Sequence, residues 1–364
     1  MPDVCIIPMQ QKLYDLFDSG QLRRPVGAYG ALTSQANKTT NPVEVSLVGK
    51  AKLGHKAKYQ ITYVDAECDA VVDCGDPGSG ICDTGSSENV QTDVKTIGNC
   101  ISLKNIQLTT DQVRDLCNYG PDAWLAAQLV GRLDTGMRAI NETIATTLCA
   151  NAGCFATGDA LPKDLALINP TTNTPLFGAT RQITQHFRQA GVMNEPILIG
   201  GDTLDMYSYG QEYGGQTQGG SNFREPRFPV FYDNQLSTVC PITNRETLLA
   251  LAPGVAQFVN YLYNVGDFQT NLGGNIDLLS LYQQNVAYTK GVLEDPVTGY
   301  LWDMSVVYDT CNDVWKINIK THFDVWVMRL TQCYAPCFTG ILKYGVCKFT
   351  PPTCDSFTGE ILPG

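Results

Sequence analysis

The chain has 364 residues, of which 43% are hydrophobic and 17% charged, so it can bury a substantial core. Its net charge of −11 at pH 7 disfavours a protein that coats nucleic acid through a basic surface. The N-terminal residues lack a basic segment followed by an apolar run, and no stretch of about 18 apolar residues occurs. We therefore expect neither a signal peptide nor a membrane span.

The first predicted element is a short amphipathic helix over residues 8–19, with Leu13, Leu16 and Phe17 on one side. Residues 20–42 follow as a polar tract rich in Gly, Gln, Asn, Thr and Pro, without periodicity. This tract is typical of an extended arm rather than of a domain.

Residues 43–64 alternate between apolar and polar side chains, which predicts strands. The next stretch, 65–93, carries eight acidic residues and no Lys or Arg: Asp65, Glu67, Asp69, Asp73, Asp76, Asp83, Glu88 and Asp93. The strand-like stretch also contains a basic segment, with Lys50, Lys52, His55, Lys56 and Lys58. A basic segment beside an acidic one predicts a long exposed hairpin. It is either a solvated loop or a protrusion that docks on a neighbouring subunit through complementary charge. A calcium site here is a weaker alternative, because EF-hand spacing is absent.

The clearest local signal is one long helix. Thr109 and Gln112 have the spacing of a capping box, and Pro121 has the place of a first helical residue. Apolar residues then recur at steps of three or four, at Leu125, Leu129, Leu133, Met137, Ile140, Ile144 and Leu148. This stripe predicts a helix over about 121–150, about 45 Å long. A single narrow stripe on so long a helix indicates packing across a sheet.

Further elements follow this helix. We expect a helix over 180–191, closed by Gly191, and a buried strand over 196–201. Residues 209–224 form a Gly/Gln-rich loop that lacks the Lys-Ser/Thr end of a phosphate-binding loop.

The last elements are a helix and a hairpin. We expect a helix over 253–264, with Pro253 at its start. Alternation over 300–330 predicts a β-hairpin with its turn around Asn312 and Asp313. The fold class predicted from these elements is α+β.

Two Asp-Thr-Gly triplets, beginning at Asp83 and Asp134, raise the possibility of an aspartic protease. Such an enzyme needs two carboxylates on loops held between buried strands. Asp83 lies in the acidic tract, and Asp134 lies between Leu133 and Met137 on the predicted long helix. The triplets are also only 51 residues apart, which is short for a two-lobed enzyme. We therefore disfavour this hypothesis.

Other catalytic or metal-binding patterns are scarce. His55, His186 and His322 are the three histidines, and none has the spacing of a triad or a metal site. His186 is expected to border the core, and His322 to be a surface or half-buried strand residue. The 14 cysteines include two groups without a CxxC pair, so reduced thiols or a few late-formed disulfides are favoured over zinc: Cys68, Cys74 and Cys82, and Cys333, Cys337, Cys347 and Cys354.

The order of predicted elements resembles the major capsid protein of tailed double-stranded DNA phages, which has the Hong Kong 97-type fold. The phrases PILIGGDTLDMY (196–207), LLALAPGVAQFVNYLYNVGDF (248–268) and DPVTGYLWDMSVVYDTCNDVWKINIKTHFDVWV (295–327) are similar to that family. The resemblance covers about residues 20–330, and the Cys-rich tail departs from it.

The resemblance implies five segments. Residues 1–42 would form the N-terminal helix and arm, and 43–105 the extended β-hairpin loop. Residues 106–190 would be a peripheral domain containing the spine helix, and 191–320 a mixed axial domain. Residues 321–364 would return to the peripheral domain and end in the Cys-rich tail.

The implied function is structural: self-assembly into an icosahedral virion shell around double-stranded DNA. The resemblance implies no catalytic, cofactor-binding or metal-binding residue. Its partners would be other copies in pentamers and hexamers, with scaffolding, portal or decoration proteins, and DNA without sequence-specific contact. No membrane partner is implied, and assembly would occur in the host cytoplasm. Alternatives are a tail-tube or decoration subunit, or less favourably a protease using Asp83.

Overall fold

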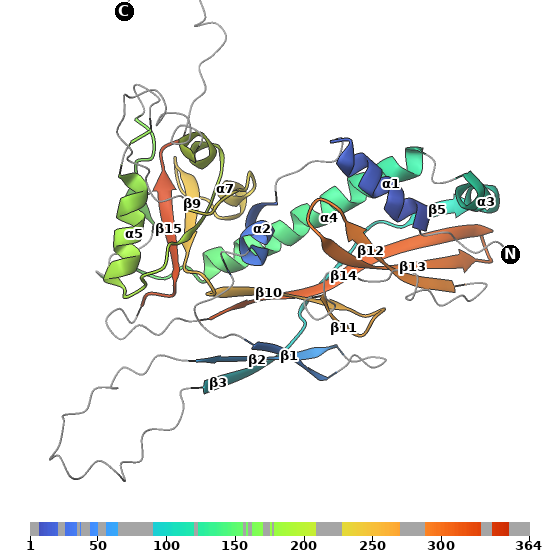
Figure 1. Cartoon of the computed structure of the whole chain (residues 1–364), viewed down its shortest axis with the longest axis horizontal. Helices are drawn as coiled ribbons and strands as arrows, with labels where there is room; N and C mark the ends of the chain where they lie inside the picture. The colour runs from blue at the N-terminus through green and yellow to red at the C-terminus, as the bar shows by residue number, and fades with distance from the viewer. Residues whose placement is uncertain are drawn as a thin grey trace, which may run out of the picture.

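The computed structural model describes residues 7–20, 26–34, 37, 44–49, 56–64, 90–119, 123–155, 158, 162–169, 175–176, 178–208, 228–269, 288–328 and 337–348. Helices and strands both contribute to the core, as the predicted α+β class requires. The strands form three sheets, of three, seven and five strands (Figure 1). Among the described residues, no helix is long and apolar enough to span a membrane.

One long strand, β14 (Val314–Val327), organises the seven-stranded sheet. On one side it pairs first with β13 (Tyr300–Asp309) and then with β10 (Ala256–Leu262). On its other side it pairs with β5 (Ile106–Thr109) and β4 (Asn99–Ser102). Strand β12 (Tyr288–Asp295) pairs with β13, and β11 (Asp267–Phe268) pairs with β10.

The predicted hairpin at 300–330 is confirmed as β13 and β14. Its turn contains Asp313, whose φ of 52° lies in the left-handed region. Asp and Asn tolerate this region better than most residues. The Asp309 carboxylate also accepts hydrogen bonds from the Cys311 backbone N–H, at 3.0 Å, and from the Asn312 side chain, at 2.8 Å.

The predicted helix over 253–264 is wrong, because this segment contains β10. Gly254, with a φ of 82°, turns the chain before the strand. Val259 and Tyr261 then face one hydrophobic cluster, whereas Phe258 packs against the main core on the opposite face. A strand buried on both faces has apolar residues without clear alternation, which is why its sequence resembled a helix.

The long helix is α4 (Ala123–Ala150), and the prediction of a long helix over about 121–150 is confirmed for these residues. Pro121 lies outside the described residues. All seven stripe residues are buried, each at most 3% exposed. Figure 1 shows α4 running from the β12–β14 region toward the five-stranded sheet. Ahead of it, α3 (Thr110–Tyr119) begins with the predicted capping box, since Thr109 and Gln112 bond each other's backbone N–H groups.

Two glycines of α4 have opposite surroundings, which yields a matched test. A Cβ added at Gly136 would lie 2.5 Å from the ring of Trp302 and 2.9 Å from Leu103, whereas nothing lies within 4 Å of a Cβ added at Gly131. We expect Gly131→Ala to stabilise the protein by about 1 kcal/mol, through helix propensity. Gly136→Ala should instead destabilise it by about 1–3 kcal/mol, through overpacking. Urea denaturation of both variants checks this, and equal effects would contradict the packing of α4 on Trp302.

The five-stranded sheet has the order β6-β15-β9-β7-β8. Its strands are β6 (Lys163–Leu165), β7 (Ile197–Gly200), β8 (Val230–Tyr232), β9 (Glu246–Leu251) and β15 (Ile341–Val346). Strand β7 confirms the buried strand predicted at 196–201. These strands come from three of the five predicted segments, so sequence segments and sheets do not correspond one to one.

Helices α5 and α7 also belong to this part of the chain, as does a helix over residues 202–208. Helix α5 (Ala179–Gln189) confirms the helix predicted at 180–191, and Gly191 follows it with a φ of 86°. Helix α7 (Leu236–Val239) lies close to α4 and β9.

The N-terminal part contains two helices. Helix α1 (Ile7–Asp18) is the predicted amphipathic helix, and its Leu13 is fully buried. The prediction of an extended arm over 20–42 is wrong for residues 27–33, which form α2 (Gly27–Thr33). Residues 27–32 of α2 are all buried, and α2 contacts α4, β7, β8 and β10. Small residues (GAYGALT) allow this close packing, and their lack of an amphipathic stripe concealed the helix.

Candidate assembly surfaces

A small sheet projects from the main body. It consists of β1 (Glu44–Gly49), β2 (Lys58–Val64) and β3 (Val90–Thr96), in the antiparallel order β1-β2-β3, and we call it the hairpin sheet. It contains the strands predicted in 43–64, and Figure 1 shows it beneath β10 and β14. Residues 65–89, which include Asp83 and most of the acidic tract, lie outside the described residues, as does His55.

The hairpin sheet is attached to the body through one separate hydrophobic cluster. Four apolar residues on the hairpin-sheet side pack against four apolar residues of the body. The first group is Ala57, Tyr59, Ile61 and Ile97, and the second is Val259, Tyr261, Trp326 and Met328. The ring centroid of Tyr63 lies 5.2 Å from that of Trp326. This cluster is separate from the main core, so the sheet is a satellite of the body rather than part of its core.

Polar contacts fix the position of the hairpin sheet on this cluster. The Tyr59 hydroxyl donates a hydrogen bond of 2.7 Å to the Asp324 carboxylate, and the Trp326 indole N–H donates one of 3.3 Å to Asp93. Burial, together with the bond to Asp324, raises the pKa of Tyr59. Tyr59 therefore stays a neutral donor over the physiological pH range.

Two titratable groups, Asp303 and His322, lie in the body beside this attachment. Asp303 accepts backbone hydrogen bonds from Tyr263 and Asn264, at 2.8 and 2.9 Å, and burial raises its pKa to about 6. His322 is half-buried, as predicted, with its ring centroid 4.2 Å from that of Tyr263. Burial lowers its pKa to about 4, so His322 is neutral at pH 7.

The outer parts of the hairpin sheet are uncovered. Val48 is 50% and Val94 is 53% exposed. Val94 is paired with Gln60, next to the inward-facing Tyr59 and Ile61 in register, so it points away from the body. Within the described residues, β1 and β3 each pair only with β2. The sheet therefore presents apolar side chains and two strand edges to whatever lies beside it.

The N-terminal helices are fastened to the body by specific polar contacts. Gln10 exchanges two hydrogen bonds with the backbone of Glu294, at 2.9 and 2.8 Å. Two backbone N–H groups in the first turn of α2 donate to side chains of other elements. The Ala28 N–H donates to the Asp233 carboxylate at 3.1 Å, and the Tyr29 N–H donates to the Asn141 side-chain oxygen at 2.9 Å. The N-terminal segment is thus built into the junction between the sheets. Sequence reasoning missed these anchors because they join residues distant in sequence.

The protease hypothesis fails for Asp134. This residue lies within α4, where its carboxylate forms an ion pair of 3.0 Å with Arg138. A helical residue cannot adopt the loop that shared-carboxylate catalysis needs.

His186 borders the core, as predicted, with its ring nitrogen 2.9 Å from the Tyr344 hydroxyl. Among the described residues, no group of three or more His, Cys, Asp or Glu side chains could hold a metal ion.

The cysteines of the described residues form two disulfides. Cys149 bonds to Cys240, and Cys154 bonds to Cys337. Cys100, Cys311 and Cys347 are free thiols. The sequence favoured reduced thiols or a few disulfides over zinc, but it did not predict these pairs.

Comparisons with known proteins place the chain beside phage structures. No protein-family model matches it, and no curated protein does. Three solved structures illustrate the similarity. A cyanophage A-1(L) capsid asymmetric unit has a TM-score of 0.43 and 13% identity, over 90% of this chain and 94% of that one. The capsid of Ralstonia phage GP4 has a TM-score of 0.41 and 11% identity, over 85% and 87%. A chain from Mycobacterium phage Che8 has a TM-score of 0.42 and 10% identity, over 87% and 90%.

Proposed function

We propose that this chain is the structural subunit of an icosahedral phage capsid that encloses double-stranded DNA. The observation that carries the proposal is the hairpin sheet, which stands off the core with exposed valines and, within the described part of the chain, with two unpaired edges. A monomer gains little from such a projection, whereas an assembling subunit can bury it against its neighbour. No catalytic role is included.

The body of the subunit suits a shell building block. Helix α4 connects the seven-stranded sheet with the five-stranded sheet through a continuous core, and α2 fills the junction between them. Such a body can pass on the forces at its interfaces without internal rearrangement. In the proposed division, 43–105 is the extended loop, which contains the hairpin sheet and ends with β4 in the seven-stranded sheet, and α4 is the spine of the peripheral domain.

The charge of the chain agrees with a DNA container. A net charge of −11 disfavours tight binding of the packaged phosphates, so the DNA can move during packaging. The proposed partners are other copies of the chain in pentamers and hexamers, with scaffolding, portal and decoration proteins. The proposed location is the virion, after assembly in the host cytoplasm.

Shortening the segment that joins β2 to β3 tests the proposal. Val64 of β2 is paired with Val90 of β3, so residues 66–88 can be replaced by a short Gly-Ser linker without removing strand pairs. We expect the subunit to keep its circular dichroism spectrum and melting temperature but to lose shell assembly, measured by sedimentation velocity. Normal shells from this variant would contradict the proposed role of residues 66–88 in assembly.

A second variant separates charge from length. It keeps the full length of segment 65–89 but replaces each Asp by Asn and each Glu by Gln. If complementary charge docks this segment on a neighbour, its assembly should be weaker than that of the wild type at low salt and similar at high salt. Equal assembly of the two proteins at low salt would rule out the electrostatic contribution.

A further inference from the structure

Both disulfides lie at the C-terminal end of α4. Cys149 belongs to the last turn of α4 and bonds to Cys240, which directly follows α7; their Cα atoms are 6.1 Å apart. Five residues later, Cys154 bonds to Cys337, which precedes β15, with Cα atoms 5.4 Å apart. The bridges therefore join α4 and the turn after it to parts of the five-stranded sheet region.

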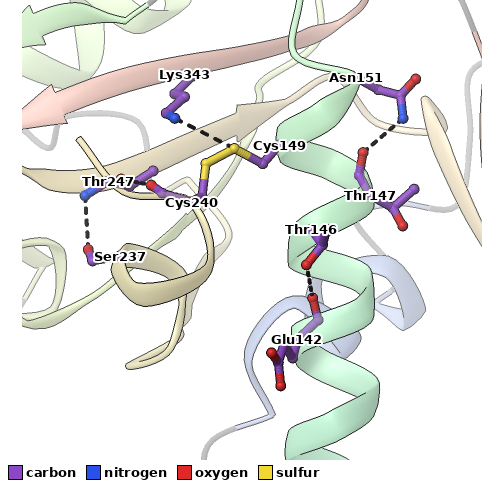
Figure 2. The surroundings of a disulfide bond; sticks show 9 residues. All are labelled: Glu142, Thr146, Thr147, Cys149, Asn151, Ser237, Cys240, Thr247 and Lys343. Atoms are coloured by element: carbon purple, nitrogen blue, oxygen red, sulfur yellow. Dashed lines mark hydrogen bonds between the residues drawn. A yellow bond between two sulfur atoms is a disulfide. The ribbon is translucent and has the colours of Figure 1, made fainter.

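The residues around each pair are held in place without the sulfur–sulfur bond. At the first pair, the Cys240 N–H donates to Leu236 at 2.8 Å, and the Thr247 hydroxyl donates to the Cys240 carbonyl (Figure 2). At the second pair, the Cys154 N–H donates to the Cys337 carbonyl at 3.1 Å. A folded subunit with reduced thiols would therefore keep its cysteines close to bonding distance.

A lysine side chain, Lys343, lies beside the first pair. Its ammonium nitrogen lies 3.6 Å from the Cys149 sulfur. Figure 2 draws this contact as a dashed line. Lys343 lies in β15 on the five-stranded sheet, and burial lowers the pKa of its side chain. A thiolate at Cys149 would offset the cost of keeping this ammonium charged, and the ammonium would stabilise the thiolate in turn.

The two sulfurs of this pair also differ in access. Cys240 is 1% exposed, whereas Cys149 is half-buried. A small oxidant therefore reaches Cys149 first. Cys240 reacts only afterwards, with a partner that is already inside the protein.

We propose that Cys149, Cys240 and Lys343 form an oxidation site for low-molecular-weight disulfides, which fastens α4 to the five-stranded sheet after the subunit has folded. The Cys149 thiol loses its proton, and the resulting thiolate attacks one sulfur of the oxidant R–S–S–R and displaces one thiolate, R–S⁻. Cys240 then loses its proton and attacks the Cys149 sulfur of the mixed disulfide, displacing the second thiolate. The two displaced thiolates take up the two protons. Two protein thiols are thus oxidised, and one small disulfide is reduced to two thiols.

The proposal differs from the formation of disulfides during folding of a secreted protein. Here the fold comes first, and Lys343 serves as a positioning residue for the Cys149 thiolate. Both bridges lie within one subunit, so this chemistry does not depend on whether the chain assembles into shells.

The test follows both bridges in the same molecule. The full chain is purified in a reductant, transferred to native buffer with oxidised glutathione, and quenched at intervals with acid. The remaining thiols are then alkylated, and the peptides are mapped by mass spectrometry. We expect both bridges to form without denaturant. Lys343→Met should slow the Cys149–Cys240 bridge about threefold, because a tenfold smaller thiolate fraction is partly offset by higher nucleophilicity. The Cys154–Cys337 bridge provides the internal control.

Lys343→Arg restores a positive charge and should return the rate of the first bridge close to the wild-type value. Near-ultraviolet circular dichroism of the reduced variants verifies their fold. Three results would overturn the proposal: bridges that form only in denaturant, an unchanged rate for Cys149–Cys240 in Lys343→Met, or equal slowing of both bridges in that variant.

Discussion

Leu133→Asp is expected to leave no folded subunit. Leu133 is fully buried near the middle of α4, within the main core. The substitution removes a large apolar side chain, which alone costs about 2–5 kcal/mol, and it places a carboxylate without a partner in an apolar site. The sum approaches the whole stability of an ordinary domain, about 5–15 kcal/mol. Soluble yield and the circular dichroism spectrum measure the outcome.

Ala127→Asp is the matched control on the same helix. Ala127 is exposed, so the same type of substitution there removes little packing and should cost less than about 1 kcal/mol, mainly through helix propensity. Leu133→Ala should give an intermediate loss of about 2–5 kcal/mol. A Leu133→Asp protein that melts like the wild type would show that α4 does not pack through its apolar stripe.

Asn37→Ala is expected to destabilise the subunit by about 3 kcal/mol. The Asn37 side chain is 3% exposed and donates to the carbonyls of Leu32 and Ala256, at 2.8 and 2.9 Å. Its oxygen accepts the Gly254 N–H at 2.9 Å. Removing the amide leaves three buried backbone groups without this partner, at about 1 kcal/mol or more each. Urea denaturation measures the loss.

Asn105→Ala is the control for this prediction. Asn105 is exposed in the connection between β4 and β5, and its removal should change the stability by no more than about 0.5 kcal/mol. If the two variants have equal stability, Asn37 does not anchor the end of α2 to the turn before β10. The N-terminal segment would then be attached more loosely than the structure indicates.

Local patterns predicted the elements that have one buried face. The stripe of α4 and the capping box of α3 are examples, since their periodicity and spacing reflect contacts within one element. The β13–β14 hairpin was predicted for the same reason. Strand β10 was mistaken for a helix because it is buried on both faces, and α2 was missed because its small residues have no periodic pattern.

The attachment of the hairpin sheet and the disulfides depend on contacts between residues far apart in the sequence. Local sequence patterns do not predict such contacts. The bond from Tyr59 to Asp324 joins residues 265 apart, and the disulfides join residues 91 and 183 apart. Composition indicated an exposed charged hairpin at 43–93. It did not indicate the cluster around Trp326 that attaches the hairpin sheet, or the ammonium of Lys343 beside Cys149.

Electron microscopy of the purified full chain is the most direct test of the proposed function. Samples would be imaged by negative stain over a range of protein concentration, salt and pH, alongside light scattering. A capsid subunit should form closed shells, or rings of five or six subunits, in which the hairpin sheet contacts a neighbouring copy. Stacked tubes, or monomers under every condition, would contradict the proposal that this chain builds an icosahedral shell.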